Sequence, residues 1–323
     1  MHVNTAAGRV GIAFLGKTLM HEHLVASLPG WESNTLVEPS SFREMTAVCV
    51  DKIAELQGAG FSSLLDPCPN DIGRDVRLMA EVAARSNFNI IFATGLYNQH
   101  LGGYPYWSIK LATEPDAAKY IADLFIHELT IGVEGTGIKA GVIKIASGFN
   151  ALTQYETTIF RAAAIASQAT GAPIMTHTEG ELGVEQVQLL AEFGIPAHRI
   201  IVGHCCGNPD HHYHMQVAKT GAYLGFDRFG IEIIQSDEVR IDSFVKLVNA
   251  GKNSQLIVSH DNVWCFRGAM QPPQIADQFS NPLHFTRVIQ PRLIEAGVSQ
   301  EAIDSILTEN PRRFFANEVI SKA

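Results

Sequence analysis

Short apolar runs alternate along the chain with longer amphipathic stretches. Several of these runs are continuously apolar up to a polar end, which is typical of strands buried on both faces of a parallel sheet. The eight runs lie at residues 14–24, 61–68, 89–97, 141–147, 172–178, 200–205, 222–227 and 256–261. The pattern predicts eight strands with helices between them.

The amphipathic stretches carry the signals that begin and end helices. The segment 40–60 starts on Ser40 or Ser41 as a cap, has Glu44 three residues after Ser41, and ends on glycine. The segment 155–171 ends in the same way. Eight strand–helix units in one chain predict a (β/α)8 TIM barrel, and an open doubly wound sheet is the alternative.

Length and composition narrow the class of protein. The chain has 323 residues, of which 46% are hydrophobic, so it can bury a large core. No linker or composition shift divides it, and we expect one domain over residues 1–323. The net charge is −9 without a basic run, which argues against nucleic acid as a partner.

The start of the chain does not resemble a signal peptide, and no window has the roughly 18 apolar residues of a membrane span. The five cysteines fit neither a zinc module nor a disulfide scaffold. We expect them to be reduced, and therefore expect a cytoplasmic protein with no membrane partner.

Polar residues that can bind metal stand at the predicted strand ends. His21 and His23 are two residues apart, so on a strand both imidazoles face one way and Glu22 faces the other. This pattern is weak by itself. It gains weight because further candidates end later strands and would meet at one barrel mouth. They are His177, His204 and Asp261.

Lys144 lies inside an otherwise apolar strand, VIKIA. One interpretation is a lysine that reaches the barrel rim or pairs with a carboxylate. A lysine ammonium has no lone pair and cannot bind a metal. A lysine that has reacted with carbon dioxide is an anionic carbamate, whose two oxygens could bridge two metal ions. Asp66, at the end of another strand, is either a partner of a site residue or a turn former.

A set of motifs runs in order over nearly the whole chain. They are LGKTLMHEHL (15–24), DIGRD (71–75), ATGLY (93–97), GVIKIA (141–146), PIMTHTEG (173–180), RIIVGHCCGNPD (199–210), GFDRFG (225–230), VSHD (258–261) and TENPRRFF (308–315). With these motifs the chain resembles the phosphotriesterase family of the amidohydrolase superfamily, and within it the phosphotriesterase-like lactonases.

The resemblance implies two divalent metal ions, with zinc expected and cobalt, iron or manganese as alternatives. It assigns six ligands: His21, His23, Lys144, His177, His204 and Asp261. The first ion would be held by the two neighbouring histidines and the aspartate, and the second by the other two histidines. Carboxylated Lys144 and a hydroxide would bridge the ions. Relatives also suggest a homodimer.

The implied function is a metal-dependent hydrolase that opens lactones, with N-acyl-homoserine lactones as the expected substrates. A bridging hydroxide would attack the carbonyl, and Asp261 would take its proton. Tyr97 and Arg228 match positions that line the site in the lactonases. A phosphotriesterase or carboxylester hydrolase with the same metal centre is the alternative, and a barrel that only binds is disfavoured because all six ligands are present.

The segment after Asp261, NVWCFRGAMQPPQ, is particular to this chain, so the substrate is less well defined than the metal centre. Apolar loop residues at the mouth suit a small-molecule substrate with an acyl tail. The predicted pocket residues are Tyr104, Trp264, Phe266 and Met270. The alternative is that some of these side chains cover the barrel or form a subunit contact.

Overall fold

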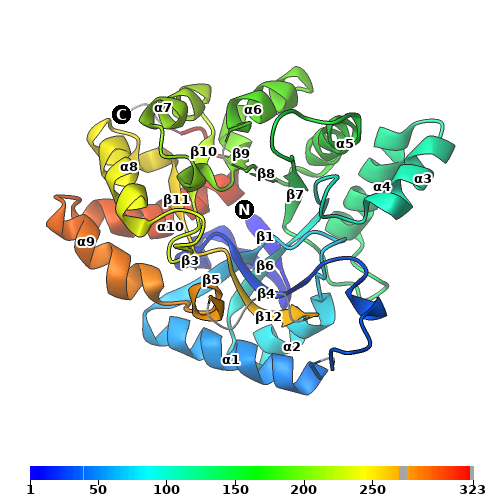
Figure 1. The fold of residues 1–323 in the computed structure, drawn as a ribbon, viewed down its shortest axis with the longest axis horizontal. Helices are drawn as coiled ribbons and strands as arrows, with labels where there is room; N and C mark the ends of the chain where they lie inside the picture. Colours follow the sequence, from blue (N-terminus) through cyan, green and yellow to red (C-terminus); the bar gives the residue numbers. More distant parts are fainter. Residues whose placement is uncertain (39, 180, 269–274, 321–323) are drawn as a thin grey trace.

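The computed structural model describes residues 1–38, 40–179, 181–268 and 275–320. Within them, eight parallel strands form one nearly closed barrel surrounded by helices (Figure 1). The strands pair in the order β11–β10–β9–β8–β7–β6–β5–β3. Their bounds are β3 Lys17–Leu19, β5 Phe61–Asp66, β6 Asn89–Leu96, β7 Val142–Ala146, β8 Ile174–His177, β9 Ile200–Val202, β10 Tyr223–Phe226 and β11 Leu256–Val258. The TIM-barrel prediction is confirmed.

The first predicted strand, 14–24, is wrong as a single element. It divides into β3 and β4 (Glu22–Ser27), and β4 pairs in parallel with β12 (Asn262–Arg267) instead of continuing the main sheet. The amide of Met20 donates to the carbonyl of Val258 at 3.3 Å, which joins the first strand to the last. At this break the chain stops pairing with β5 and starts pairing with β12, the strand that follows the last barrel strand.

The helices follow the predicted capping signals. Helix α1 (Phe42–Gly58) begins with a capping box between Ser41 and Glu44, and α5 (Gln154–Thr170) ends at Gly171 with a φ of 80°. The other helices are α2 Val76–Ser86, α3 Tyr104–Thr113, α4 Ala117–Thr130, α6 Gly183–Glu192, α7 His211–Thr220, α8 Asp237–Asn249, α9 Gln290–Glu295 and α10 Gln300–Ala316. Among the described residues, none of these helices combines the length and the apolar character that a membrane-spanning segment requires.

One apolar cluster fills the barrel interior, with members on seven of the eight strands and at Met20, directly after β3. Its members at the barrel wall are Met20, Leu65, Ile91, Ala93, Val142, Met175, Ile201, Tyr223 and Ile257. The hairpin of β1 (His2–Thr5) and β2 (Gly8–Gly11) adds Val3 to the same cluster. Since side chains alternate along a strand, the inward positions beyond this layer face the mouth.

The buried carboxylate of Asp237 and its hydrogen-bond donors hold the loop after β10. Asp237, at the start of α8, accepts hydrogen bonds from the amide of Gly230 at 3.0 Å, from the Arg240 guanidinium at 3.0 Å and from His284 Nε2 at 2.6 Å. Burial by itself would raise the pKa of Asp237, but the hydrogen bond from His284 and the other donors outweigh it and lower the pKa.

Asp237→Asn should therefore show an acid-dependent loss of stability. A depressed carboxylate pKa contributes stability above the unfolded value of about 4, and that contribution disappears as the pH falls through the lower folded value. We expect the variant to lose about 1–3 kcal/mol in the free energy of unfolding at pH 6. The difference from wild type should shrink below about pH 4. Urea unfolding over this range measures it, with exposed Asp242→Asn as control; a constant difference down to pH 3 would contradict the assignment.

Candidate metal centre

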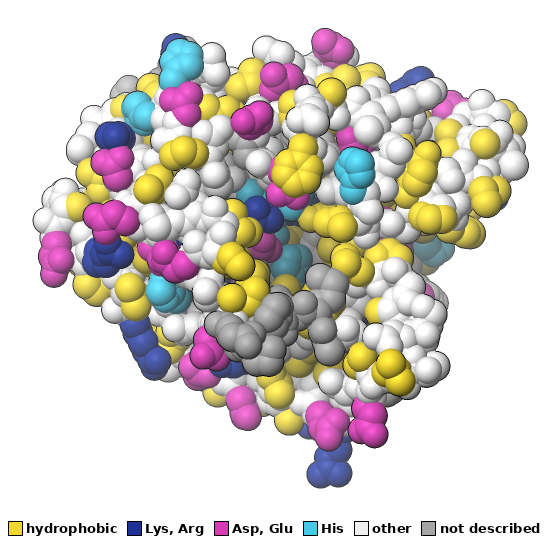
Figure 2. All heavy atoms as spheres, viewed as in Figure 1, with side chains coloured by type: hydrophobic (Ala, Val, Ile, Leu, Met, Phe, Trp, Pro, Cys, Tyr) yellow, Lys and Arg dark blue, Asp and Glu magenta, His cyan; other side chains and the backbone are white. Residues whose placement is uncertain are grey.

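The predicted ligands meet at one end of the barrel. His21 lies between β3 and β4, His23 is on β4, Lys144 is on β7, and His177 ends β8. The remaining two, His204 and Asp261, follow β9 and β11. Figure 2 shows a hollow at this end, with histidine, acidic and basic side chains at its base and hydrophobic side chains at its rim.

Strand alternation accounts for two of these positions. Val142 and Met175 belong to the interior layer, and Lys144 and His177 stand two residues further along the same strands. Both therefore point inward above the apolar core. Lys144 is buried, with Nζ at 3.4 Å from the carbonyl of Thr176, and burial lowers its pKa to about 8.

The carboxylate of Asp261 is the centre of the cluster. Its Oδ1 lies 3.2 Å from His21 Nε2 and 3.2 Å from His23 Nε2. Candidate ligand atoms of His21, His204 and Asp261 all lie within 4.8 Å of one another. The ring of His204 is 4.7 Å from that of His21 and 4.5 Å from that of His177, measured between centroids.

Two of the residues adopt an unusual backbone. His204 has a φ of 62° and Asp261 a φ of 54°, both in the left-handed region that non-glycine residues seldom occupy. Such conformations persist only where the surrounding structure enforces them, and they concentrate at functional sites. Here each turn carries its side chain back over the strand ends.

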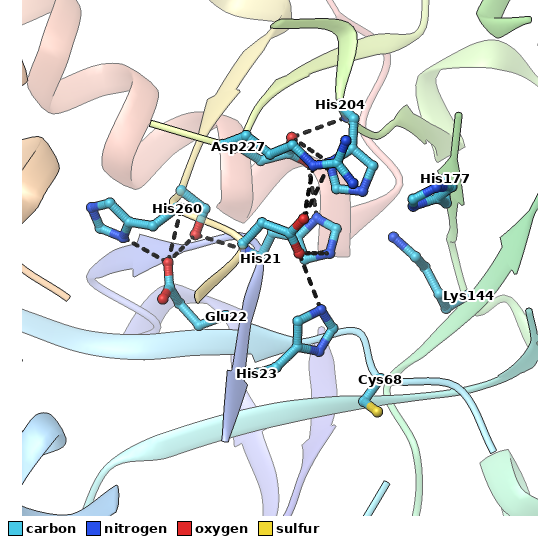
Figure 3. Close-up of polar contacts among 12 residues, drawn as sticks. His21, Glu22, His23, Cys68, Lys144, His177, His204, Asp227 and His260 are labelled. Atoms are coloured by element: carbon cyan, nitrogen blue, oxygen red, sulfur yellow. Dashed lines mark hydrogen bonds and ion pairs between the residues drawn. The ribbon is translucent and has the colours of Figure 1, made fainter. Parts of the chain in front are cut away.

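Two further carboxylates stand behind the imidazoles. Asp227 Oδ2 is 2.9 Å from His21 Nδ1, and Asp227 Oδ1 is 3.0 Å from His204 Nδ1 (Figure 3). Asp66 Oδ1 is 3.2 Å from His23 Nδ1, so Asp66 is a partner of a site residue. An ionised carboxylate can only accept, so each ring donates from Nδ1 and directs Nε2 toward the centre of the site.

Glu179 and Tyr97 contact the ring of His177. Its Nε2 is 2.8 Å from Glu179 Oε1, and the Tyr97 hydroxyl lies 3.1 Å from its Nδ1. Burial opposes ionisation of Glu179, but the hydrogen bond and charge of His177 outweigh it and lower the pKa of Glu179 to about 2. Burial raises the pKa of Tyr97, which keeps its hydroxyl protonated and able to donate.

Arg228 and Tyr97 both lie at the cluster. Arg228 Nε donates to Asp261 Oδ2 at 2.8 Å, and its NH1 lies 3.9 Å from Glu179 Oε2. Burial alone would raise the pKa of Asp261, but the nearby imidazoles of His21 and His204, the Arg228 guanidinium and the hydrogen bond with His23 hold it well below its ordinary value. The carboxylate is therefore ionised, although part of it stays open to solvent at the mouth.

The donor set fits a divalent cation. With Nδ1 of His21 donating to Asp227, the Nε2 lone pair of His21 faces Asp261 Oδ1 at 3.2 Å, and His23 Nε2 lies at the same distance from that oxygen. Burial lowers the pKa of His21 to about 4 and that of His204 well below its ordinary value, so these rings are neutral, as ligand imidazoles must be. Burial opposes protonation of His23, but hydrogen bonds to Asp261 and Asp66 outweigh it and raise its pKa, so the point between these carboxylates favours positive charge.

The structure describes three of the four predicted pocket residues, and they lie on two different elements. Trp264 and Phe266 lie on β12, on the opposite side of the strand from Cys265, whose Sγ contacts the Met45 carbonyl of α1 at 3.8 Å. The ring of Tyr104 packs edge-on against Tyr155 at 5.1 Å between centroids. Met270 lies outside the described residues.

Sequence reasoning missed Asp227 and Glu179 as partners of the histidines. Asp227 could have been found by alternation, because Tyr223 of the interior layer is followed by Gly225 and Asp227 at inward positions. Glu179 stands two residues beyond His177 and after the strand has ended, so no periodicity marks it.

Glu22 faces away from the cluster, as predicted. Its Oε1 accepts from Ser259 Oγ at 2.8 Å, from the amide of His260 at 3.0 Å and from His260 Nδ1 at 2.7 Å. In Figure 3, Glu22 and His260 lie on the far side of His21 from Lys144.

Comparison with known proteins agrees with this geometry. Residues 1–315 match the model of the phosphotriesterase family. The chain belongs to this family. It is 31% identical over 320 residues to the phosphotriesterase homology protein of Mycobacterium tuberculosis, covering 98% of each chain. It is also 31% identical to the aryldialkylphosphatase of Saccharolobus solfataricus, covering 94% of this chain and 95% of that protein.

Solved structures of this phosphotriesterase-family fold superpose closely. The organophosphorus hydrolase of Deinococcus radiodurans has a TM-score of 0.94 and 34% identity, covering 98% of this chain and 97% of that one. A mutant from the same organism, described as a PTE-like lactonase, has a TM-score of 0.93 and 34% identity over 97% of this chain and 99% of that one. The protein is a metal-dependent hydrolase, which confirms the predicted enzyme class.

Proposed function

We propose that the protein hydrolyses lactones, with N-acyl-homoserine lactones as the substrate class. The observation that carries the proposal is the hydroxyl of half-buried Tyr97 beside His177, opposite the Arg228 guanidinium on Asp261. These two donors suit a carbonyl oxygen that becomes anionic and a ring oxygen that leaves. The similarity to a structure described as a PTE-like lactonase supports this choice.

The metal assignment follows the donor geometry. His21, His23 and Asp261 would hold one ion, because their candidate ligand atoms converge on Asp261 Oδ1. His177 and His204, whose rings are in edge contact, would hold the other. Lys144 would lie between the pairs as a carbamate, an anion that suits two cations better than an ammonium does. Zinc matches the nitrogen and oxygen donors, and cobalt, iron or manganese are alternatives.

Two bound ions would acidify a water molecule between them and polarise the substrate oxygen. The chain's own groups supply the remaining steps. Asp261, ionised and hydrogen-bonded by Arg228, would accept the proton of the attacking water. Tyr97 would donate a hydrogen bond to the carbonyl oxygen, and Arg228 would stabilise the oxygen that leaves. Asp227, Asp66 and Glu179 keep the imidazoles in orientation.

The acyl chain would lie along the apolar mouth. Trp264 and Phe266, on the side of β12 away from α1, are the proposed walls, with Tyr104 and Met270 as further candidates. Each methylene of the chain that leaves water contributes roughly 0.8 kcal/mol. We expect longer acyl chains to be preferred for this reason.

A phosphotriesterase or carboxylester hydrolase is the second candidate function. The same donors could polarise a phosphoryl oxygen, and two of the similar proteins are named aryldialkylphosphatase and organophosphorus hydrolase. The cytoplasmic location and a homodimer stay predictions, which cell fractionation and sedimentation analysis would test.

Metal analysis tests the ligand assignment. The purified protein should hold about two divalent ions per chain. His21→Ala or His23→Ala should lower the metal content and abolish turnover, since each removes an imidazole next to Asp261. The control is His212→Ala, which changes an exposed histidine at the start of α7. Unchanged metal content in either ligand variant would refute the assignment.

Lys144→Ala tests the carbamate. The variant should lose metal and activity, and added bicarbonate or a short carboxylic acid should partly restore both by supplying the missing oxygens. Lys119→Ala, which removes an exposed lysine of α4, is the control. An active variant with its full metal content would show that Lys144 serves only as a cation.

Tyr97→Phe separates the substrate classes, because it removes only the hydroxyl. Loss of one such donor costs on the order of 10²–10³ in rate. We expect lactone turnover to fall by this factor while the metal content stays the same, and wild-type kcat/KM to rise along a series of acyl chain lengths. Faster turnover of an aryl phosphotriester than of any lactone would favour the second candidate function instead.

A further inference from the structure

We infer that Asp227 is a positioning residue that sets the ring tautomer of one histidine from each half of the metal centre, and so couples the two halves. The inference rests on the proposed metal assignment, in which His21 serves one ion and His204 the other. One buried carboxylate then determines which nitrogen of each ring is free to bind metal.

The contacts of Asp227 divide between its two oxygens. Oδ2 faces His21 Nδ1 at 2.9 Å. Oδ1 faces two donors of His204, the backbone amide at 3.0 Å and the ring Nδ1 at 3.0 Å. An ionised carboxylate has only acceptors, so both rings must carry their proton on Nδ1 and present Nε2 as a lone pair.

The surroundings of Asp227 are shaped for this double role. A Cβ on Gly225 would lie 2.6 Å from Asp227 Oδ2, so glycine at this position leaves the space that the carboxylate occupies. The left-handed turn at His204 brings its amide and its ring to the same oxygen. Asp227 itself is completely buried, so water does not compete for its lone pairs.

This geometry makes the effect of Asp227→Asn asymmetric. The backbone amide of His204 can only donate, so the side-chain oxygen of asparagine must take the place of Oδ1. The amide nitrogen then faces His21 Nδ1 and donates to it. His21 must move its proton to Nε2, the atom that lies 3.2 Å from Asp261 Oδ1. His21 therefore loses its ligand lone pair, while His204 keeps its acceptor and its tautomer.

The experiment compares Asp227→Asn with wild type and with Asp242→Asn, an exposed aspartate of α8. Long-range ¹H–¹⁵N spectra of metal-free protein labelled at histidine report the tautomer of each ring, with His21 assigned by its absence in His21→Ala. We expect His21 to change from the Nδ1–H to the Nε2–H form and His204 to stay unchanged. A merely structural role would not produce this selective change.

Zinc titration provides the second measurement. Loss of a group that orients a metal ligand typically costs 10–100-fold in affinity. In Asp227→Asn, one ion should weaken by about this factor and the other by much less. In Asp227→Ala, which removes both acceptors, both ions should weaken.

The outcomes keep the two proposals apart. An unchanged His21 tautomer in Asp227→Asn, or equal weakening of both ions, overturns the role of Asp227 and leaves the metal assignment intact. A wild-type protein that binds no zinc overturns the proposed metal centre, while the tautomer spectra still decide whether Asp227 sets the rings. If Asp227→Ala does not fold, the nearly isosteric Asp227→Asn carries the test alone.

Discussion

The carbonyl of His21 accepts a hydrogen bond from the amide of Asp261 at 3.0 Å, and this contact joins the first strand of the barrel to the last. Around it, Met20 bonds to Val258, and Glu22 binds both Ser259 and His260. These hydrogen bonds close the barrel and hold His21 and His23 next to Asp261. Any shift of one strand along the other would separate Asp261 from the imidazoles, so barrel closure and the metal centre depend on the same register.

The mouth above the apolar core concentrates charge that burial would otherwise penalise. Buried ionisable groups are tolerated when partners satisfy them. Here each carboxylate meets imidazole, guanidinium or backbone donors, as Asp66 does with His23 and with the amides of Leu24 and Cys68. The cluster therefore gains its order from hydrogen bonds between strands, and a cation at its centre would supply the attraction that its facing lone pairs lack. Hydrogen-bond donors fixed in this way would also stabilise a developing oxyanion.

The candidate ligands and the proposed pocket residues lie on different parts of the fold. The candidate ligands come from strands and from turns tied directly to them, whereas Tyr104, Trp264 and Phe266 lie on elements added beyond the barrel strands. In this architecture loops vary without disturbing the barrel, so the proposed acyl site can change while the candidate ligands stay in place.

Local periodicity determined much of this protein. Apolar runs with polar ends predicted a parallel barrel and put His177, His204 and Asp261 at strand ends that meet at one mouth. The motifs added the identity of the chemistry. Tertiary structure alone decided that 14–24 breaks at Met20 and His21, because the first strand changes its partner there from β5 to β12. It alone decided that Asp227 serves His21 and His204, since a contact between residues 206 apart in sequence depends on barrel closure. The left-handed turns at His204 and Asp261 were likewise invisible, because no local preference of histidine or aspartate requires them; the packed strands around each turn impose them.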